Sequence, residues 1–581
     1  METTIDRTEP QEPAGSGGFG SAAPRNSSER SWPTASTPVP PRWLLKLLIV
    51  AAIALAYANS LRGAFVLDDR RGIVENPTIC DLGSPGTILS TFPRSTTSGR
   101  PILNLSLALN YALGGLDPLG YHLVNIGIHA LAALALFGIA RRTLRLPRID
   151  PVLSARADAI AFAAALLWAV HPIQTSSVTY VVQRAESLMG LFYLLTLYST
   201  LRGALHAPGT PGQRGWSALA VAACALGMGT KEVMVTAPLI VLLYDRIFLS
   251  RDWKEILIRR GTIHVLLAST WAILGLLMAA NPARGGTAGF DLPFSWLRYL
   301  GTEFGVILHY LRLSVWPRPL VLDYGWPIAE RPGEALPAGL AVAALAGIAA
   351  WSLIRRPRLG FLGAWFFLIL APTSSIVPIA DPIFEHRIYL PLAAVALTGV
   401  LAADRLIRRI AGHPPAGRRA GSRIEAIALA IVALALGLTT VSRNADYRSE
   451  VAIWKDTIRK RPLNARAHDY LGLALGREGA YDEAIRHHNE ALRLRPDMLN
   501  AYYNRANTRL RAERYEEAIA DYSRYLRLRR DPKAYNNRAI AHFGIGAYDE
   551  AWADVDSCRL FGLEPHEEFL EPLRQASDRN R

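Results

Sequence analysis

Long apolar runs recur along the chain between residues 43 and 441. Most of them are roughly 17 to 22 residues long, and a helix needs about 20 apolar residues to cross the hydrocarbon core of a bilayer. Half of the 581 residues are hydrophobic (50%), and a mean hydropathy of +0.15 would be unusual in a soluble protein of this size. The runs therefore predict an all-α membrane protein that crosses the bilayer many times.

About twelve segments are candidates for these crossings. They cover residues 43–61, 121–140, 157–170, 186–201, 216–228, 233–248, 263–280, 297–315, 336–353, 361–379, 388–403 and 424–441. Segment 297–315 carries Arg298, Glu303, His309 and Arg312. These side chains are costly in lipid, so we expect an interfacial or re-entrant helix there. About eleven spanning helices then remain.

The basic residues lie mostly between the apolar segments. The formal net charge is +15, and arginine pairs occupy positions 141–142, 259–260, 355–356, 408–409 and 418–419. The preference of Lys and Arg for cytoplasmic loops explains this distribution better than nucleic-acid binding does. If the N-terminus and the basic stretch 405–423 are both cytoplasmic, segment 424–441 ends outside. We therefore expect a cytoplasmic N-terminus, an extracytoplasmic C-terminal region and no nucleic-acid partner.

Two further features of composition bear on domains and cofactors. Residues 1–40 are rich in Pro, Ser, Gly and Thr, which predicts a disordered tail. The cysteines at positions 80, 224 and 558 lie far apart without CxxC spacing. That spacing argues against a zinc site and gives no disulfide framework, although a pairing of Cys80 with Cys558 stays open.

After residue 441 the sequence becomes charged and repeats itself. Equivalent positions hold Gly472, Ala506 and Ala539, then Tyr481, Tyr515 and Tyr548, then Ala484, Ala518 and Ala551. The spacing of about 34 residues is the period of the tetratricopeptide repeat (TPR), a pair of packed helices. The sequence thus predicts three parts: the tail (1–40), a multi-pass membrane domain (41–442) and a TPR α-solenoid (443–581).

The first helices of TPR units line the concave face of the array. We therefore expect that face to bind an extended polypeptide, with some of its residues merely solvated. The candidate acceptor-binding residues are Tyr502, Asn504, Tyr535 and Asn536.

An adjacent acid pair, Asp68 and Asp69, follows the first apolar segment in the stretch FVLDDRRGIVENP. Paired acids beside lipid are costly unless they face water or take part in function. One interpretation is a solvated turn with a capping aspartate. The other is a catalytic carboxylate, a general base that takes a proton from an acceptor hydroxyl.

Other charged residues fall at helix ends on the same predicted face. They are Arg100, His171, Arg184, Glu186, Lys231, Glu232, His386 and Arg387. Each alone is typical of an interfacial anchor or a helix cap. Together they predict a site that holds both carboxylates and cations, and cations at that depth suit an anionic phosphate. The sequence contains no P-loop and no HExxH motif that would favour another chemistry.

The order of these motifs resembles one known family. The stretches FVLDDRRGIVENP, GRPILNLSLALNYALGG, YHLVNIGIHALAALAL, HPIQTSSVTYVVQRAESLMGLFYLLTLY, KEVMVTAPLIVLLYD, EHRIYLPL and SRNADYRSEVAIWKDTIRKRP precede the repeats. This succession is similar to that of the transmembrane and TPR repeat-containing O-mannosyltransferases and their bacterial relatives, in the GT-C class of glycosyltransferases. The resemblance covers roughly residues 43–565.

The resemblance implies a GT-C-like helix bundle in a membrane, here expected to be a bacterial inner membrane. It also implies a polyprenyl-phosphate sugar donor, an inverting transfer at the outer face and no required divalent metal or other cofactor. On that pattern Asp68 or Asp69 is the base. Arg184, Lys231 and Arg387 hold the donor phosphate, while Arg100, His171, Glu186, Glu232 and His386 line the site. The TPRs bind a protein or envelope acceptor.

A second hypothesis remains open at this point. The bundle could anchor a non-enzymatic TPR scaffold for assembly of envelope proteins. The two hypotheses differ on the acid pair, because a scaffold would tolerate replacement of both aspartates by asparagine.

Overall fold

A computed structural model describes residues 41–93, 95–281, 288–410 and 420–577. Within these ranges the regular structure is helical, apart from one isolated β-bridge between Ala288 and Ile379. The predicted disordered tail, 1–40, lies outside the described residues. The all-α class predicted from the apolar runs is confirmed.

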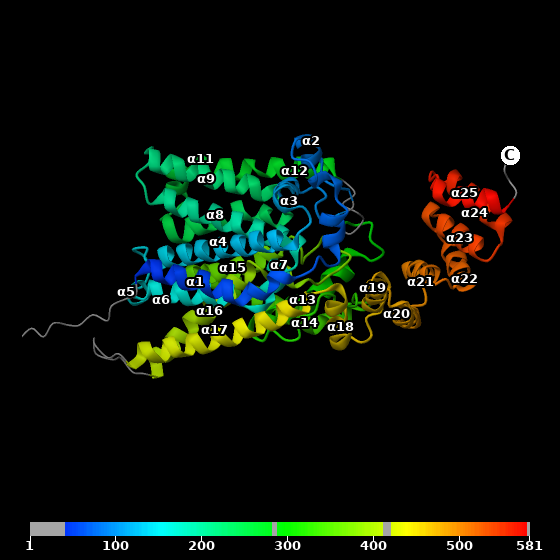
Figure 1. The fold of residues 1–581 in the computed structure, drawn as a ribbon. Coiled ribbons are helices and arrows are strands. Elements are labelled where there is room, and N and C mark those ends of the chain that lie inside the picture. Colours follow the sequence, from blue (N-terminus) through cyan, green and yellow to red (C-terminus); the bar gives the residue numbers. More distant parts are fainter. Residues whose placement is uncertain (1–40, 94, 282–287, 411–419, 578–581) are drawn as a thin grey trace, which may run out of the picture.

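The N-terminal part of the chain forms a bundle of helices that run side by side (Figure 1). The long members are α1 (Arg42–Tyr57), α4 (Pro118–Leu144), α6 (Ala157–Ala169), α8 (Arg184–Ala204), α9 (Pro211–Met228), α10 (Ala237–Tyr244), α11 (Trp253–Ser269), α12 (Trp271–Ala280), α13 (Trp296–Val315), α14 (Pro332–Arg355), α15 (Pro357–Leu370), α16 (Pro391–Ile410) and α17 (Ala420–Asp446). Each predicted apolar segment falls on one or more of these helices.

Five helical segments in the described part of the chain are long and apolar enough to cross a membrane. They are Arg42–Arg62, Pro118–Leu144, Trp253–Ala280, Pro332–Arg355 and Ile424–Asp446. A sixth would be α6 together with the segment Pro172–Val178, across a bend of 50°. The helix α13 is not among them. The expected number of about eleven crossings therefore stays a prediction.

Two differences from the sequence-based prediction have a local cause. The helix α15 ends at Leu370, although the predicted segment runs to position 379, because Pro372 follows and removes a backbone donor. The helix α3 (Pro101–Gly114) was not predicted. Asn104 and Asn110 interrupt its apolar pattern; both are buried, and Asn104 is hydrogen-bonded to the first loop.

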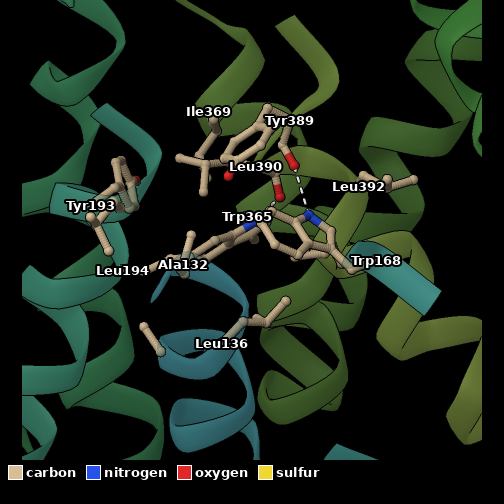
Figure 2. Close-up of a cluster of buried hydrophobic side chains, with 14 of the residues drawn as sticks. Ala132, Leu136, Trp168, Tyr193, Leu194, Trp365, Ile369, Tyr389, Leu390 and Leu392 are labelled. Atoms are coloured by element: carbon tan, nitrogen blue, oxygen red, sulfur yellow. Dashed lines mark hydrogen bonds between the residues drawn. The ribbon is translucent and has the colours of Figure 1, made fainter. Parts of the chain in front are cut away.

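The centre of the bundle is closed by aromatic side chains (Figure 2). The indole nitrogen of Trp168 donates to the carbonyl of Tyr389 (2.8 Å), and that of Trp365 donates to the carbonyl of Leu390 (2.9 Å). These bonds satisfy polar groups that would be costly in an apolar interior. They fix the chain just before α16 against α6 and α15.

The first and last helices of the bundle are partners. The Asn444 side chain at the end of α17 donates to the carbonyl of Ala56 (2.9 Å), and the Asn59 side chain donates to the carbonyl of Val441 (2.8 Å). The hydroxyl of Thr440 donates to the carbonyl of Val170 on the other side (2.7 Å). The helix α17 therefore joins α1 to the end of α6.

The C-terminal helices form paired units that extend away from one end of the bundle (Figure 1). They are α18 (Glu450–Lys460), α19 (Ala465–Arg477), α20 (Tyr481–Leu494), α21 (Leu499–Arg511), α22 (Tyr515–Leu526), α23 (Pro532–Gly544), α24 (Tyr548–Leu560) and α25 (Glu567–Ala576). Small residues lie where helices meet: Ala506 and Ala518 are fully buried in one cluster. A Cβ on Gly472 would come within 2.8 Å of the His488 ring. The predicted repeat register is confirmed.

The bundle end, the first loop and the first repeat share one apolar core. Val66 of the loop, Tyr180 of the bundle, and Trp454 and Leu471 of the repeats are buried in the same cluster. The repeats are thus seated on the end of the bundle where the first loop lies, and the predicted site residues gather there.

Candidate active site

The acid pair lies in a tight turn whose geometry treats the two aspartates differently. Asp69 is fully buried. Its Oδ2 accepts the amide of Val66 (2.9 Å), and its Oδ1 accepts the amide of Val182 (2.6 Å). Leu67 adopts a left-handed φ of 47°, a conformation that costs a residue with a side chain free energy unless its surroundings enforce it. Asp69 therefore holds the turn and ties it to the segment Val181–Gln183.

Burial sets the protonation of Asp69. It raises the pKa of that carboxyl to about 8, while the two amide hydrogen bonds act in the opposite direction. The negative charge of Asp68 adds to the rise. A carboxyl with both oxygens engaged by buried amides is not placed to take a proton from an outside hydroxyl.

Asp68, by contrast, is exposed at the surface of the turn. Its backbone amide donates to the Tyr180 hydroxyl (3.0 Å). The surrounding protein atoms raise the pKa of the Asp68 carboxyl, and nearby Asp381 raises it further. A hydrogen bond from Tyr180 and the charges of Arg466 and Arg100 lower it. Of the two acids, only Asp68 is open to an acceptor.

A buried amide network supports the loop that carries the turn. The Asn76 side chain donates to the carbonyl of Gly72 (2.9 Å) and to the Asn104 side chain (3.0 Å). The Asn104 amide donates in turn to the Thr78 hydroxyl (2.9 Å) and the carbonyl of Ile88 (2.8 Å). The helix α3 thus fixes the first loop over the bundle end.

Beside the turn lie two ion pairs built from predicted site residues. Arg100 contacts Glu232 (3.2 Å) and donates to the carbonyl of Thr96 (2.9 Å). Lys231 contacts Glu186 (2.5 Å), and both are buried. Burial lowers the pKa of Arg100 to about 10, and the charges of Glu186 and Asp68 oppose that fall. The charges of both ion-pair glutamates and of Asp68 therefore act on Arg100.

Residues just before α16 complete the cluster. Arg387 donates to the carbonyls of Pro382 (2.5 Å), Asp381 (2.7 Å) and Thr373 (3.3 Å). Its guanidinium is also 4.0 Å from the carboxylate of the buried Glu303. His386 is buried. Burial lowers the pKa of its ring well below the usual value, and the charges of Lys231, Arg387 and Arg100 lower it further. The imidazole is thus neutral in a cationic neighbourhood.

Two of the predicted site residues are buried and make their hydrogen bonds within the protein. Arg184 is fully buried, and its guanidinium donates to Asn125 (2.6 Å), to the carbonyl of Ser106 (3.0 Å) and to the carbonyl of Tyr121 (3.0 Å). It is occupied by protein oxygens, so the geometry points away from the predicted phosphate binding. His171 is buried and caps a helical turn, accepting the amide of Ile173 (3.3 Å).

The predicted acceptor-binding residues of the repeats also differ in how exposed they are. Tyr502 is buried, and its hydroxyl donates to the carbonyl of Pro496 (3.2 Å). Asn504 and Asn536 are half-buried, and Asn504 donates to Asp469 (2.9 Å). Tyr535 is half-buried and stacks on Phe561. Asn504, Tyr535 and Asn536 keep accessible polar surface that a polypeptide could contact, whereas Tyr502 packs into its repeat.

No group of three or more His, Cys, Asp or Glu side chains in the described ranges is arranged to hold a metal ion. The expectation that no divalent metal is needed stays a prediction. The three cysteines are free thiols, so the open pairing of Cys80 with Cys558 is not formed.

Sequence reasoning missed several residues of this end of the bundle. Tyr180 contacts the turn, and Asp381, Asp323 and Arg466 form an ion-pair group. The charges of Asp381 and Arg466 act on Asp68. Tyr180 lies within a stretch that carries the family resemblance, but its contact with Asp68 joins residues 112 positions apart. Arg466 belongs to the repeats, where charged residues are typical of solvated surface.

Comparisons with known proteins identify the repeats and a set of relatives. The tetratricopeptide repeat family model matches residues 442–498 and 503–556. The chain is 26% identical over 547 residues to the protein O-mannosyl-transferase Tmtc3 of Drosophila melanogaster, covering 81% of this chain and 58% of that protein. It is 25% identical to human TMTC3 (79% and 52% covered) and 27% identical to mouse TMTC4 (78% and 66% covered).

The chain thus spans little more than half the length of these first curated relatives. Among solved structures it is similar to ArnT from Cupriavidus metallidurans bound to undecaprenyl phosphate. That alignment has 18% sequence identity and a TM-score of 0.40 and covers 87% of this chain and 78% of that one.

Proposed function

We propose that this chain, a relative of the transmembrane and TPR repeat-containing O-mannosyltransferases, is a membrane glycosyltransferase. Its donor would be a sugar, mannose by analogy with the relatives' names, linked to a polyprenyl phosphate. Its acceptor would be a hydroxyl of a protein or another envelope molecule. The observation that carries the proposal is the accessible Asp68 beside the charged cluster of Arg100, Glu232, Lys231 and Glu186.

The two aspartates would have different roles in an inverting transfer. Asp68 takes the proton of the acceptor hydroxyl while that oxygen attacks the anomeric carbon of the donor sugar. The bond from the anomeric carbon to the phosphate oxygen breaks, and the polyprenyl phosphate leaves with the electron pair. Attack opposite the leaving group inverts the configuration, and Asp69 positions the turn without joining the proton transfer.

Cations neutralise the charge that grows on the departing phosphate. Lys231 carries three N–H donors, and Glu186 accepts from it at 2.5 Å. Arg100 is only half-buried, and the charge of Asp68 acts on it. We assign the phosphate contact to Lys231 and Arg100, with Arg387 holding the loop beneath them.

The reaction would take place on the extracytoplasmic face of a bacterial inner membrane, the side on which the distribution of arginines puts the end of α17. A reporter enzyme fused after residue 445 tests this. A reporter active only outside the cytoplasm should function there, and its cytoplasmic counterpart should not. Cytoplasmic activity at that position would reverse the orientation and overturn the proposed access of the donor.

The activity itself is tested with purified protein in lipid vesicles. Polyprenyl-phosphate mannose and a mixture of hydroxyl-bearing peptides are supplied, and glycopeptides are measured by mass spectrometry. The wild type should transfer the sugar and Asp68→Asn should not. If the wild type transfers from no lipid-phosphate sugar, and cells lacking the protein keep an unchanged envelope glycoproteome, the scaffold hypothesis replaces the enzyme.

A further inference from the structure

One arginine of the first repeat reaches the proposed transfer site. Arg466, in the first turn of α19, forms a two-point contact with Asp323: Nε to Oδ2 at 2.5 Å and Nη2 to Oδ1 at 2.7 Å. The same Nη2 also donates to Asp381 Oδ1 at 2.6 Å. A single guanidinium from the soluble part of the chain therefore holds carboxylates from two different loops of the bundle.

One of those two loops leads into the site. Asp323 lies in the loop 316–331 between α13 and α14, and Asp381 lies in the loop 371–384 that leads to His386 and Arg387. The backbone carbonyl of Asp381 accepts from Arg387 (2.7 Å), while its side chain is held by Arg466. Its charge is also among those that act on the Asp68 carboxyl.

Further contacts fix the first repeat against the loop that carries Asp323. The Asn464 side chain, just before Arg466, donates to the carbonyl of Asp323 (3.1 Å). Gly325 has a φ of +53°, and a Cβ there would lie 3.1 Å from the Asn464 amide, so the loop passes close to the repeat.

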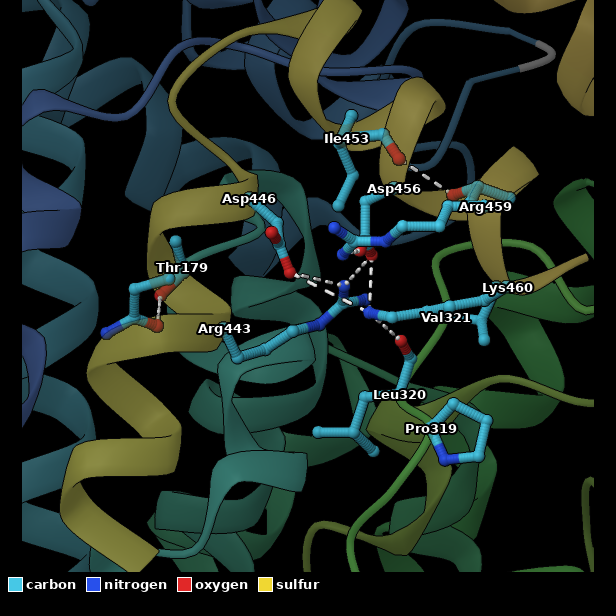
Figure 3. Close-up of polar contacts among 12 residues, drawn as sticks. Thr179, Pro319, Leu320, Val321, Arg443, Asp446, Ile453, Asp456, Arg459 and Lys460 are labelled. Atoms are coloured by element: carbon cyan, nitrogen blue, oxygen red, sulfur yellow. Dashed lines mark hydrogen bonds and ion pairs between the residues drawn. The ribbon is translucent and has the colours of Figure 1, made fainter.

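A second set of ion pairs secures the same joint (Figure 3). Arg443 of α17 contacts Asp456 of α18 (2.9 Å), and Lys460 contacts Asp456 (2.5 Å) and donates to the carbonyl of Leu320 (2.8 Å). The joint therefore connects α17, the first repeat and the loop 316–331 through groups that are mostly buried.

We propose that Arg466 is a positioning residue that the first repeat supplies to the transfer site, where it balances Asp381 and so keeps Asp68 able to act as the base. The inference rests on the proposed function. It makes the seating of the repeats on the bundle part of the catalytic apparatus as well as a means of presenting the acceptor.

The physical reason is the set of charged and titratable groups that act on Asp68. They are Asp69 on the same turn, Tyr180 from the bundle, Arg100 before α3, Asp381 from the loop and Arg466 from the repeat. Removing Arg466 removes a cation and leaves Asp381 as an unbalanced like charge. Both changes disfavour the ionised form of Asp68, so the base would be protonated up to a higher pH.

The test compares pH profiles of kcat/KM for the wild type, Arg466→Gln and Arg466→Lys in vesicles. In Arg466→Gln the acid limb should move to higher pH by on the order of 1 unit, because one cation is lost and the charge of Asp381 is left unbalanced. At pH values below the limb the rate should fall about tenfold, with recovery at high pH. Arg466→Lys keeps the charge and should restore most of the limb.

Two further variants separate electrostatics from folding. Arg538→Gln removes an equivalent two-point contact, with Asp554 (2.7 and 2.8 Å), in a repeat that lies farther from the bundle, and its profile should match the wild type. Adding Asp381→Asn to Arg466→Gln removes the unbalanced charge and should return the limb toward its wild-type position. An unshifted limb in Arg466→Gln, or a loss at every pH that Asp381→Asn does not relieve, would overturn the inference.

A measurement that needs no turnover keeps this result distinct from the function. Carbodiimides react with the protonated carboxyl, so the labelling of Asp68 followed by mass spectrometry against pH reports its ionisation directly. The labelling midpoint should be higher in Arg466→Gln than in the wild type. Equal midpoints would reject the role of Arg466 even if transfer is observed, whereas a shifted midpoint without any transfer would reject the glycosyltransferase alone.

Discussion

Replacing the two adjacent aspartates one at a time should give opposite phenotypes. Asp69→Ala removes the acceptor of two buried amides, those of Val66 and Val182. An unsatisfied buried donor costs about 1–3 kcal/mol, so the pair predicts a loss of about 2–6 kcal/mol in the free energy of unfolding. Asp68→Asn changes an exposed side chain and should alter stability by no more than about 0.5 kcal/mol.

The same two variants should reverse their order in activity. Loss of a general base lowers the rate by a factor of about 10²–10⁴, which we expect for Asp68→Asn in the fully folded protein. Asp69→Asn keeps the shape of the side chain and one acceptor oxygen, so its folded fraction should retain more activity. The defect in that variant is a displaced turn rather than a missing base.

Both quantities can be measured on the same preparations. Unfolding in detergent micelles is followed by tryptophan fluorescence, and transfer is measured from polyprenyl-phosphate sugar at saturating acceptor. The reasoning fails if Asp69→Ala unfolds at the wild-type midpoint, because the amide contacts would then contribute nothing. It also fails if Asp68→Asn is fully active, because no other carboxylate of the turn is open to an acceptor.

Three further predictions concern packing, the cations and pH. Ala506→Leu should overpack a buried helix contact and lower the free energy of unfolding by about 1–3 kcal/mol, whereas the exposed Ala520→Leu should not; equal melting temperatures would contradict the close packing at Ala506. Arg100→Gln should raise the KM for the lipid donor about tenfold or more, since a charge-assisted hydrogen bond contributes about 1.5–3 kcal/mol, while Arg184→Gln should lower stability and leave that KM unchanged in the folded fraction; the opposite pattern would return Arg184 to the phosphate site. Because burial raises the pKa of Asp69 to about 8, above the value of about 3.9 expected in the unfolded chain, its contribution to stability is full below that lower value and is lost as pH rises through 8. Between about pH 4 and pH 8, the unfolding midpoint of the wild type should therefore fall more than that of Asp69→Asn, and parallel curves would contradict the assignment.

The positions of the long helices could be predicted from local sequence, because bilayer thickness and helix geometry together set the length of apolar run that each crossing needs. Apolar runs of bilayer length predicted α1, α4 and α17 within a few residues. The TPR units could be predicted equally well, because small residues that recur at a fixed period indicate close contacts between helices. The helix α3 was not predicted because its buried asparagines interrupt the apolar pattern of a membrane-spanning helix.

The site was only partly predictable, for a different reason. The acid pair and the cations stand out as charges at helix ends, but what separates Asp68 from Asp69 is the amide of Val182, 113 residues away from Asp69. Likewise, the sequence alone suggests that Arg184 binds a ligand, whereas in the fold its guanidinium donates to the carbonyls of Ser106 and Tyr121. Partners supplied from distant segments decide whether a charge binds the protein or a substrate.

The pairing of α1 with α17 has a consequence for biogenesis. Asn444 and Ala56, which join the two helices, are 388 positions apart, so at synthesis rates of about 5–20 residues per second α1 waits roughly 20 to 80 seconds for its partner. During that interval the polar groups at the end of α1 lack their partners on α17. Chains cut short before residue 441 can never make these contacts. Such fragments should be captured by insertion factors or degraded by membrane proteases, which would make the last helix the checkpoint for release of the finished protein.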